Sequence, residues 1–177
     1  MGDTHAAEEG VGMRQRDRIE FEGVFDACYH SVLHTAFVIL HDRGRAEEVT
    51  QDAFLKLYER WNDANRIERP GAWVRTVAVH AAVRRAQREL SQSITLIDQP
   101  ADADPLPDVD LRRALAVLTP RQRAAVALYY LEDRPVDEIA DLMGVSTSTV
   151  KQHLFRARSE LAALLTETQE EATRYGD

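Results

Sequence analysis

The sequence predicts an all-α protein with two small helical domains joined by an acidic flexible linker. Apolar residues recur at steps of three and four through long stretches, which is the period of an amphipathic helix. No run alternates apolar and polar residues for long enough to form a strand. The chain has 177 residues, 44% apolar and 29% charged. This composition suits one or two soluble domains and excludes a protein that is disordered or fibrous over most of its length.

The linker is the clearest boundary in the chain. Residues 93–108 hold three prolines, four aspartates and no base, and so carry half of the net charge of −8. Acidic residues and prolines with little aliphatic content are typical of a spacer. The expected organisation is a flexible N-terminus (1–17), a first unit (18–92), the linker (93–108), a second unit (109–166) and a C-terminal tail (167–177), which is either frayed or part of a partner contact.

Three helices are expected in the first unit. The first has an apolar stripe from Phe21 to Leu40, and the second has one from Val49 to Trp61. Residues 62–69 are polar and aperiodic, which predicts a loop, and Pro70 suits the first turn of a third helix. The predicted stripe of the third helix comprises Trp73, Val77, Ala78 and Ala81.

The second unit begins with an apolar cluster from Leu111 to Leu118, followed by a helix start signal. Thr119-Pro120-Arg121-Gln122 has the form of a capping box with proline at the first helical position. Two turns further on, Val126, Tyr129 and Tyr130 continue the apolar pattern of the helix that this signal opens.

Residues 135–161 have the pattern of a helix-turn-helix. Gly144 can take the left-handed conformation that ends a helix, and Ser146 can cap the next one. That second helix would bury Val150, Leu154, Ala157 and Leu161. Its outer face is polar at the N-terminal end and basic beyond it, which suits base edges and phosphates in a major groove. The candidate DNA contacts are Thr147, Ser148, Lys151, Gln152, Phe155 and Arg156. The alternative is an ordinary helical hairpin with a solvated face.

These motifs resemble the sigma-70 family. The segment from Leu118 to Arg158, with Glu138-Ile-Ala and Met143-Gly-Val-Ser inside it, is similar to region 4 of bacterial sigma factors and in part to response-regulator helix-turn-helix proteins. Upstream, residues 45–55 resemble the region 2 motif that grips RNA polymerase. Residues 69–78, followed by Arg84-Arg85, resemble the promoter-contacting helix. With regions 2 and 4 and a short linker, residues 18–166 resemble an extracytoplasmic-function sigma factor.

An acidic face is expected on the second helix, away from its buried stripe. It consists of Glu47, Glu48, Gln51, Asp52 and Leu55. An acidic surface with an exposed leucine can bind a basic partner helix and bury a small apolar centre. The resemblance implies that this partner is core RNA polymerase, through the coiled coil of the β′ clamp. A merely solvated acidic face is the alternative.

The resemblance also implies contacts with the minus-10 promoter element. Basic residues along the third helix suit DNA phosphates, and the preceding loop of the family captures a base flipped out of the melted strand. The candidates are Asn62, Asp63, Asn65, Arg66, Arg75, His80, Arg84, Arg85 and Arg88. His80 stands where the family often has Asn, so the base preference stays open. Charge that serves solubility alone is the alternative for the helix.

The sequence gives little sign of a metal site or of a catalytic site. His30 and His34 lie four residues apart near Cys28, but no third ligand and no general base accompany them, so we expect no metal and no cofactor. Cys28 falls in the apolar stripe, which predicts a core thiol. No phosphate loop, triad or carboxylate pair stands out, and the protein is expected not to be an enzyme. The N-terminus has no secretory signal and no apolar run approaches the ~20 residues of a membrane helix, which with the single cysteine predicts a cytoplasmic location without membrane insertion.

The sequence and this resemblance therefore predict a sigma factor that binds core RNA polymerase through its β′ clamp and β subunits. It would direct promoter-specific transcription initiation, with region 4 reading the minus-35 duplex through the six candidates on its second helix and region 2 binding the melted minus-10 element. The family commonly has an anti-sigma partner, which we also expect. The alternative is a stand-alone helix-turn-helix repressor or activator, which would bind a palindrome as a dimer.

Overall fold

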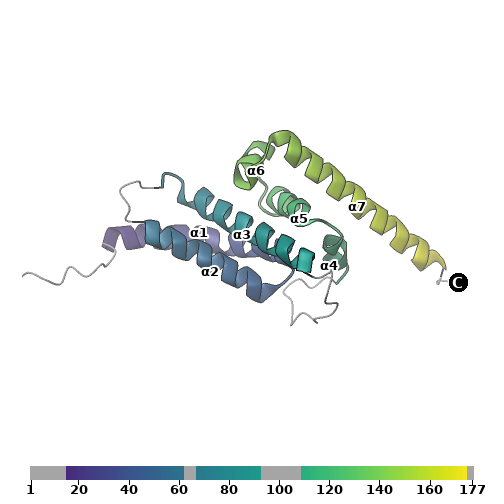
Figure 1. The fold of residues 1–177 in the computed structure, drawn as a ribbon, viewed down its shortest axis with the longest axis horizontal. Coiled ribbons are helices and arrows are strands. Elements are labelled where there is room, and N and C mark those ends of the chain that lie inside the picture. Colours follow the sequence, from purple (N-terminus) through teal and green to yellow (C-terminus); the bar gives the residue numbers. More distant parts are fainter. Residues whose placement is uncertain (1–14, 62–66, 93–108, 175–177) are drawn as a thin grey trace, which may run out of the picture.

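The structure, a computed structural model, describes residues 15–61, 67–92 and 109–174. In this part of the chain every regular element is a helix, which confirms the prediction of an all-α fold (Figure 1). The elements are α1 (Gln15–Leu40), α2 (Arg43–Arg60), α3 (Pro70–Gln92), α4 (Val109–Ala116), α5 (Pro120–Val126), the π-helical turn η1 (Ala127–Leu131), α6 (Val136–Met143) and α7 (Thr147–Arg174). The linker at 93–108 lies outside the described residues.

Helices α1, α2 and α3 form a three-helix bundle. α2 begins six residues before the predicted stripe because Asp42 caps it, and the Asp42 carboxylate accepts a hydrogen bond from the Arg45 backbone N–H at 2.8 Å. Ile39, Leu57 and Val74 are fully buried, one from each helix. Burial of such side chains is the main stabilising term of a helical bundle.

By length and composition alone, α1 could cross a membrane, but the fold gives its apolar residues another use. Every residue from Thr35 to Leu40 is buried. α2 and α3 pack against α1, and α5 and η1 also contact it. α1 is therefore a core helix, and Cys28 lies in it as the predicted buried thiol.

The local signals of the second unit are confirmed. The Thr119 hydroxyl accepts a hydrogen bond from the Gln122 N–H, and the Gln122 side chain accepts one from the Thr119 N–H at 2.6 Å. Gly144 ends α6 with φ at 64°, and the Ser146 hydroxyl accepts a bond from the Thr149 N–H at 3.2 Å. The predicted stripe of the recognition helix is Val150, Leu154 and Ala157, which are buried, and Leu161, which is half-buried.

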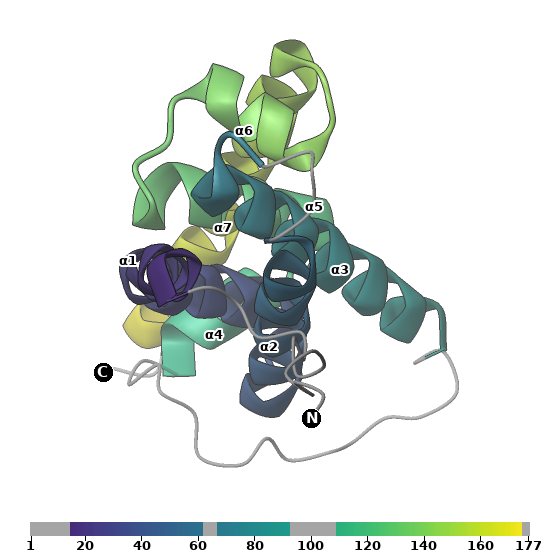
Figure 2. The same cartoon turned by 90° about the vertical axis from the view of Figure 1, so that its left-hand side faces the viewer.

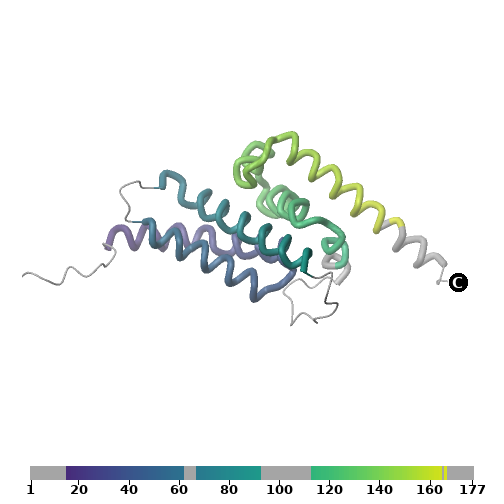
Figure 3. Tube along the Cα trace, viewed as in Figure 1, coloured from purple at the N-terminus to yellow at the C-terminus, as the bar shows by residue number. Residues whose placement is uncertain are grey.

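Helix α7 is longer than the sequence predicted. The tail was expected to start at residue 167, but the helix continues to Arg174. Figure 3 traces the coloured part of α7 as one unbroken helix. Most of residues 167–174 are the helix formers Glu, Gln, Ala and Arg, and no proline or glycine interrupts them, which accounts for the continuation.

The predicted stripe of α3 is only partly right. The residues that the structure buries are Val74, Ala78, Val79, Ala82 and Ala86, whereas Trp73, Val77 and Ala81 are half-buried. The reason is that α3 is covered on two sides, by α1 and α2 in the bundle and by α5 and α6 of the second unit (Figure 2). A pattern with one stripe cannot describe a helix that is covered twice.

The two predicted units pack against each other. One core cluster contains Val32 of α1 and Val79 of α3 together with Leu128, Ile139 and Leu154 from the second unit. A smaller cluster joins Val38 of α1 to residues of α4 and α7, among others. The predicted organisation in two helical domains is confirmed, and in this structure the two units share a core.

Candidate nucleic-acid and protein interfaces

The predicted protein-binding face lies on the outer side of α2. Gln51, Asp52 and Leu55 are exposed, and Leu55 keeps 56% of its surface in contact with solvent. Tyr58, three residues further on and 46% exposed, extends this face and was not predicted. Its ring packs edge-on against Phe21 at 5.4 Å, which holds it in place. The face thus offers an apolar centre beside carboxylates.

Glu48 and Arg85 connect this face to the basic side of α3. An Arg85 guanidinium nitrogen lies 2.7 Å from a Glu48 carboxylate oxygen, and Glu89 pairs with both Arg85 and Arg45. The hydrogen bond to Glu48 is the main reason that the pKa of Arg85 is raised. A residue predicted for polymerase and a residue predicted for DNA therefore pair with each other. Glu47 pairs with Arg43 along α2 at 2.9 Å.

The structure separates the predicted minus-10 residues into different environments. Arg84 and Arg88 are exposed on α3, whereas Arg85 is engaged with Glu48. His80 is half-buried and faces the turn of the helix-turn-helix, because a Cβ built on Gly144 would lie 3.5 Å from the His80 ring. The loop candidates Asn62, Asp63, Asn65 and Arg66 lie outside the described residues.

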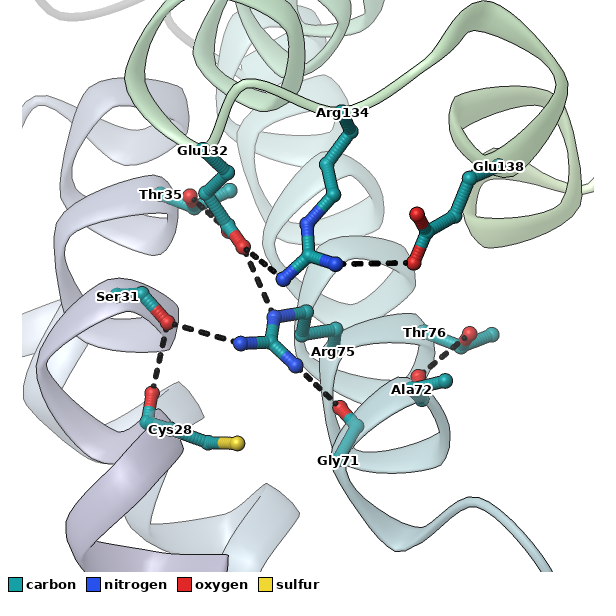
Figure 4. Close-up of polar contacts among 10 residues, drawn as sticks. All are labelled: Cys28, Ser31, Thr35, Gly71, Ala72, Arg75, Thr76, Glu132, Arg134 and Glu138. Atoms are coloured by element: carbon teal, nitrogen blue, oxygen red, sulfur yellow. Dashed lines mark hydrogen bonds and ion pairs between the residues drawn. The ribbon is translucent and has the colours of Figure 1, made fainter.

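Arg75 lies between the two units and not on an exposed ridge. Its side chain is 12% exposed, and its Nε donates to Glu132 at 2.8 Å (Figure 4). Its two other guanidinium nitrogens donate to the Gly71 carbonyl at 3.0 Å and the Ser31 hydroxyl at 3.3 Å. Because its donors are used in this way, Arg75 can contact DNA only after the two units separate.

A cavity of about 410 Å³ lies among residues of α1, the end of α2 and the start of α3. Trp61 and Ile67 supply apolar lining, Glu20 and Glu68 supply carboxylates, and Arg60 supplies a cation. The Arg60 guanidinium lies 5.5 Å from the ring centre of Trp73, and the indole N–H of Trp61 has no partner among the described residues. A flat apolar wall with polar groups suits a planar heterocycle.

A second cavity, of about 200 Å³, lies between α3 and the second unit. Val79, His80 and Arg84 line it from α3, and Arg121 and Met143 line it from the other side. Arg121 was not among the predicted residues. The signal for it was weak, because a base in the first turn of a helix is usually only solvated surface.

The predicted recognition face of α7 is presented to solvent. Thr147, Ser148, Lys151, Gln152, Phe155 and Arg156 are all exposed, and Phe155 keeps 70% of its surface in contact with solvent. Beside this face, Arg158 donates to the Tyr130 hydroxyl at 2.7 Å. His153 is half-buried behind the face. Burial lowers the pKa of His153, and the nearby charges of Arg121 and Arg156 lower it further.

An exposed polar and basic helix after a glycine turn is typical of a helix-turn-helix DNA-binding protein. The three-helix bundle upstream of it distinguishes sigma factors from other proteins of this class. Residues 24–90 match the family model "Sigma-70 region 2", and residues 108–161 match "Sigma-70, region 4". The two matches together cover about two thirds of the chain. The chain belongs to the sigma-70 family, and it is an extracytoplasmic-function sigma factor that directs RNA polymerase to promoters.

Two sigma factors align with this chain over most of their length. The chain is 26% identical to the RNA polymerase sigma factor YlaC of Bacillus subtilis (strain 168), over 90% of this chain and 98% of that one. It is 28% identical to the RNA polymerase sigma-E factor of Streptomyces coelicolor (strain ATCC BAA-471 / A3(2) / M145), over 81% of this chain and 84% of the other.

Two solved structures share the fold. The sigma factor RpoE in complex with the anti-sigma factor NepR from Bartonella quintana aligns with a TM-score of 0.63 and 22% identity, over 83% of this chain and 97% of that one. CnrH in complex with the cytosolic domain of CnrY aligns with a TM-score of 0.61 and 19% identity, over 85% of this chain and 90% of that one. At these identities the likeness establishes the fold.

Proposed function

We propose that this sigma factor binds RNA polymerase and the two promoter elements through three separate surfaces. The outer face of α2 binds core RNA polymerase, α7 reads the minus-35 duplex in the major groove, and α3 with the Trp61 cavity binds the melted minus-10 strand. The observation that carries this assignment is the exposure of all six predicted side chains on one face of α7, directly after a capped glycine turn. A recognition helix presents its first turns in this way.

At minus-35, the order of side chains on α7 divides the contacts. Lys151 and Gln152 lie in the second turn, where side chains reach base edges, and Arg156 lies beyond them among the phosphates. The hydroxyl groups of Thr147 and Ser148 can bond either to bases or to the backbone. Exposed Phe155 suits apolar contact with a thymine methyl group.

At minus-10, the Trp61 cavity receives an unpaired base. Flipping a base out of a duplex costs a few kcal/mol, and stacking on an aromatic ring returns about 1–3 kcal/mol per base. Trp61 supplies the ring, Arg60 a cation, and Glu68 an acceptor for a base edge. Arg84 and Arg88 are exposed on α3, where they can hold the phosphates of the same strand.

The partners follow from the same proposal. Core RNA polymerase and promoter DNA are the two obligatory ones, and both require a location in the cytoplasm. An anti-sigma factor is the third, because the sigma factor RpoE in the first solved structure described above is bound to the anti-sigma factor NepR.

The test is transcription in a defined system. Purified protein is mixed with core RNA polymerase and a library of promoter fragments, and the transcript start sites are sequenced. We expect co-elution with core polymerase and starts at one family of promoters. A stand-alone repressor or activator gives the opposite result, with tight binding to palindromic duplex DNA and no association with core polymerase.

A further inference from the structure

The contact between the two units cannot persist when both promoter elements are bound. The names minus-35 and minus-10 imply about 25 base pairs between the elements, or roughly 85 Å along the DNA axis. In this structure the His80 ring is 3.5 Å from a Cβ built on Gly144, and α7 begins three residues later at Thr147. Three residues span at most about 10 Å, so the two DNA-binding surfaces approach to within roughly 20 Å.

We propose that this packed arrangement is a closed, inactive state of the sigma factor, and that Glu132, Arg75 and Thr35 form the latch that holds it. The proposal rests on the function proposed above, because it assumes that α3 and α7 bind different promoter elements. The linker of 16 residues at 93–108 can span about 50 Å when extended, so the chain is long enough for the units to separate.

The latch is a buried carboxylate from one unit surrounded by donors from the other. The Glu132 side chain is 4% exposed. One of its oxygens accepts a hydrogen bond from the Thr35 hydroxyl at 2.7 Å, and the other accepts one from Arg75 Nε at 2.8 Å (Figure 4). Arg134 of its own unit lies 3.6 Å away and is also bonded to Glu138.

The backbone around Glu132 is unusual in a way that supports a specific role. The π-helical turn η1 ends at Leu131, and the Glu132 N–H bonds to the carbonyl of Ala127, five residues back. Asp133 follows with φ at 50°, a left-handed conformation that non-glycine residues seldom adopt. Such turns and outliers occur often at functional positions. Here they bring the Glu132 carboxylate to α1 and α3.

The chemistry of the latch makes closure specific but reversible. A buried ion pair contributes little net stability compared with apolar groups of the same shape, whereas removal of one partner leaves a costly buried charge. If Glu132 loses its charge, Arg75 is a buried cation without a carboxylate partner in the closed state. Opening hydrates Arg75, so the open state is favoured. If both residues become apolar, closure no longer requires dehydration of two charges and becomes tighter.

Two variants test this prediction in opposite directions. Glu132→Gln keeps the shape and the Thr35 bond but removes the charge, and we expect a larger radius of gyration by small-angle X-ray scattering. Since only the open fraction binds productively, the affinity for core RNA polymerase should rise by roughly five-fold or more. The double variant R75M/E132L should keep the radius of the unmodified protein and bind core polymerase more weakly.

Glu138→Gln is the matched control. It removes a carboxylate that pairs with Arg134 inside the second unit, and it should change neither the radius nor the affinity. An unchanged radius together with unchanged affinity in Glu132→Gln overturns the latch. If Glu132→Gln does not fold, the test uses R75M/E132L only. An affinity of this double variant for core polymerase equal to or above that of the unmodified chain then overturns the latch.

The two proposals fail differently. If the unmodified chain does not bind core polymerase, the proposed function is wrong, whereas the scattering comparison needs no polymerase and still tests closure. If the unmodified chain binds and starts transcripts but neither variant behaves as expected, the function stands and the latch is wrong.

Discussion

The exposed leucine on α2 gives the sharpest test of the polymerase-binding face. Leu55→Ala removes the apolar centre of this face without disturbing the core, because 56% of Leu55 is exposed to solvent. Full burial of a leucine side chain is worth about 1.5–3 kcal/mol. About half of the side chain is available to a partner, so the expected loss is ~1–1.5 kcal/mol. Because 1.4 kcal/mol corresponds to a tenfold change, the Kd for core polymerase should rise by roughly five- to tenfold.

The assay is a competition titration with core polymerase at fixed salt, with the urea unfolding of each variant measured in parallel. Leu55→Ala should change the free energy of unfolding by less than about 0.5 kcal/mol, as is usual for exposed sites. Leu90→Ala is the matched control, because Leu90 is also an exposed leucine, at 63%, but belongs to α3 and not to the α2 face. Equal affinities for the Leu55 and Leu90 variants would refute the assignment of the face.

Charge reversal at Asp52 separates the acidic contribution from the apolar one. Among the residues that the structure describes, Asp52 has no basic partner, so Asp52→Lys creates repulsion against a basic partner without breaking an internal pair. We expect a slower association with core polymerase and a weaker dependence of affinity on salt. Glu48→Lys is less informative, because it also places a second cation beside Arg85.

The remaining predictions concern α7 and the second unit. Ala at Lys151 or Gln152 should alter the minus-35 sequences recovered from a random library at a cost of ~1–3 kcal/mol for the lost base contact, whereas Arg156→Ala should weaken all sequences evenly and lower the salt slope by about 1. Thr119→Ala removes the capping box and should lower the free energy of unfolding by about 1 kcal/mol, measured in urea. His153 has a lowered pKa in the folded chain, so unfolded chains take up the proton first as the pH drops below 6.5. Stability should therefore fall there, and less so in His153→Gln.

The features predicted correctly from the sequence depend on short spacings. The capping box at Thr119, the left-handed Gly144 and the Ser146 cap each involve residues within a few positions of one another, and local geometry decides them. The recognition face of α7 follows from the same logic, because its residues are those that the buried stripe leaves outside. The exposure of Phe155 was predicted in this way.

The features that were missed depend on contacts between distant segments. Arg75 and Glu132 lie 57 residues apart, and neither carries a local signal that it will be buried. The second buried side of α3 arises from α5 and α6, so it leaves no single periodicity in the sequence of α3. The pairing of Glu48 with Arg85 shows a further limit, since the charge of a residue does not tell whether its partner is DNA, another protein or its own neighbour.

Closure shortens the distance between the two DNA-binding surfaces but leaves the recognition face of α7 exposed to solvent. All six predicted minus-35 residues remain exposed in the closed chain, whereas Arg75 is buried at the junction and His80 faces Gly144. A closed chain can therefore meet duplex DNA through α7 but cannot reach a melted strand at the distance that a promoter requires. Binding to core polymerase must separate the units before both elements can be read, and the free energy of closure is then subtracted from that of polymerase binding. A junction that includes a buried ion pair beside its apolar contacts suits this requirement, because a purely apolar junction of the same size would resist opening more strongly.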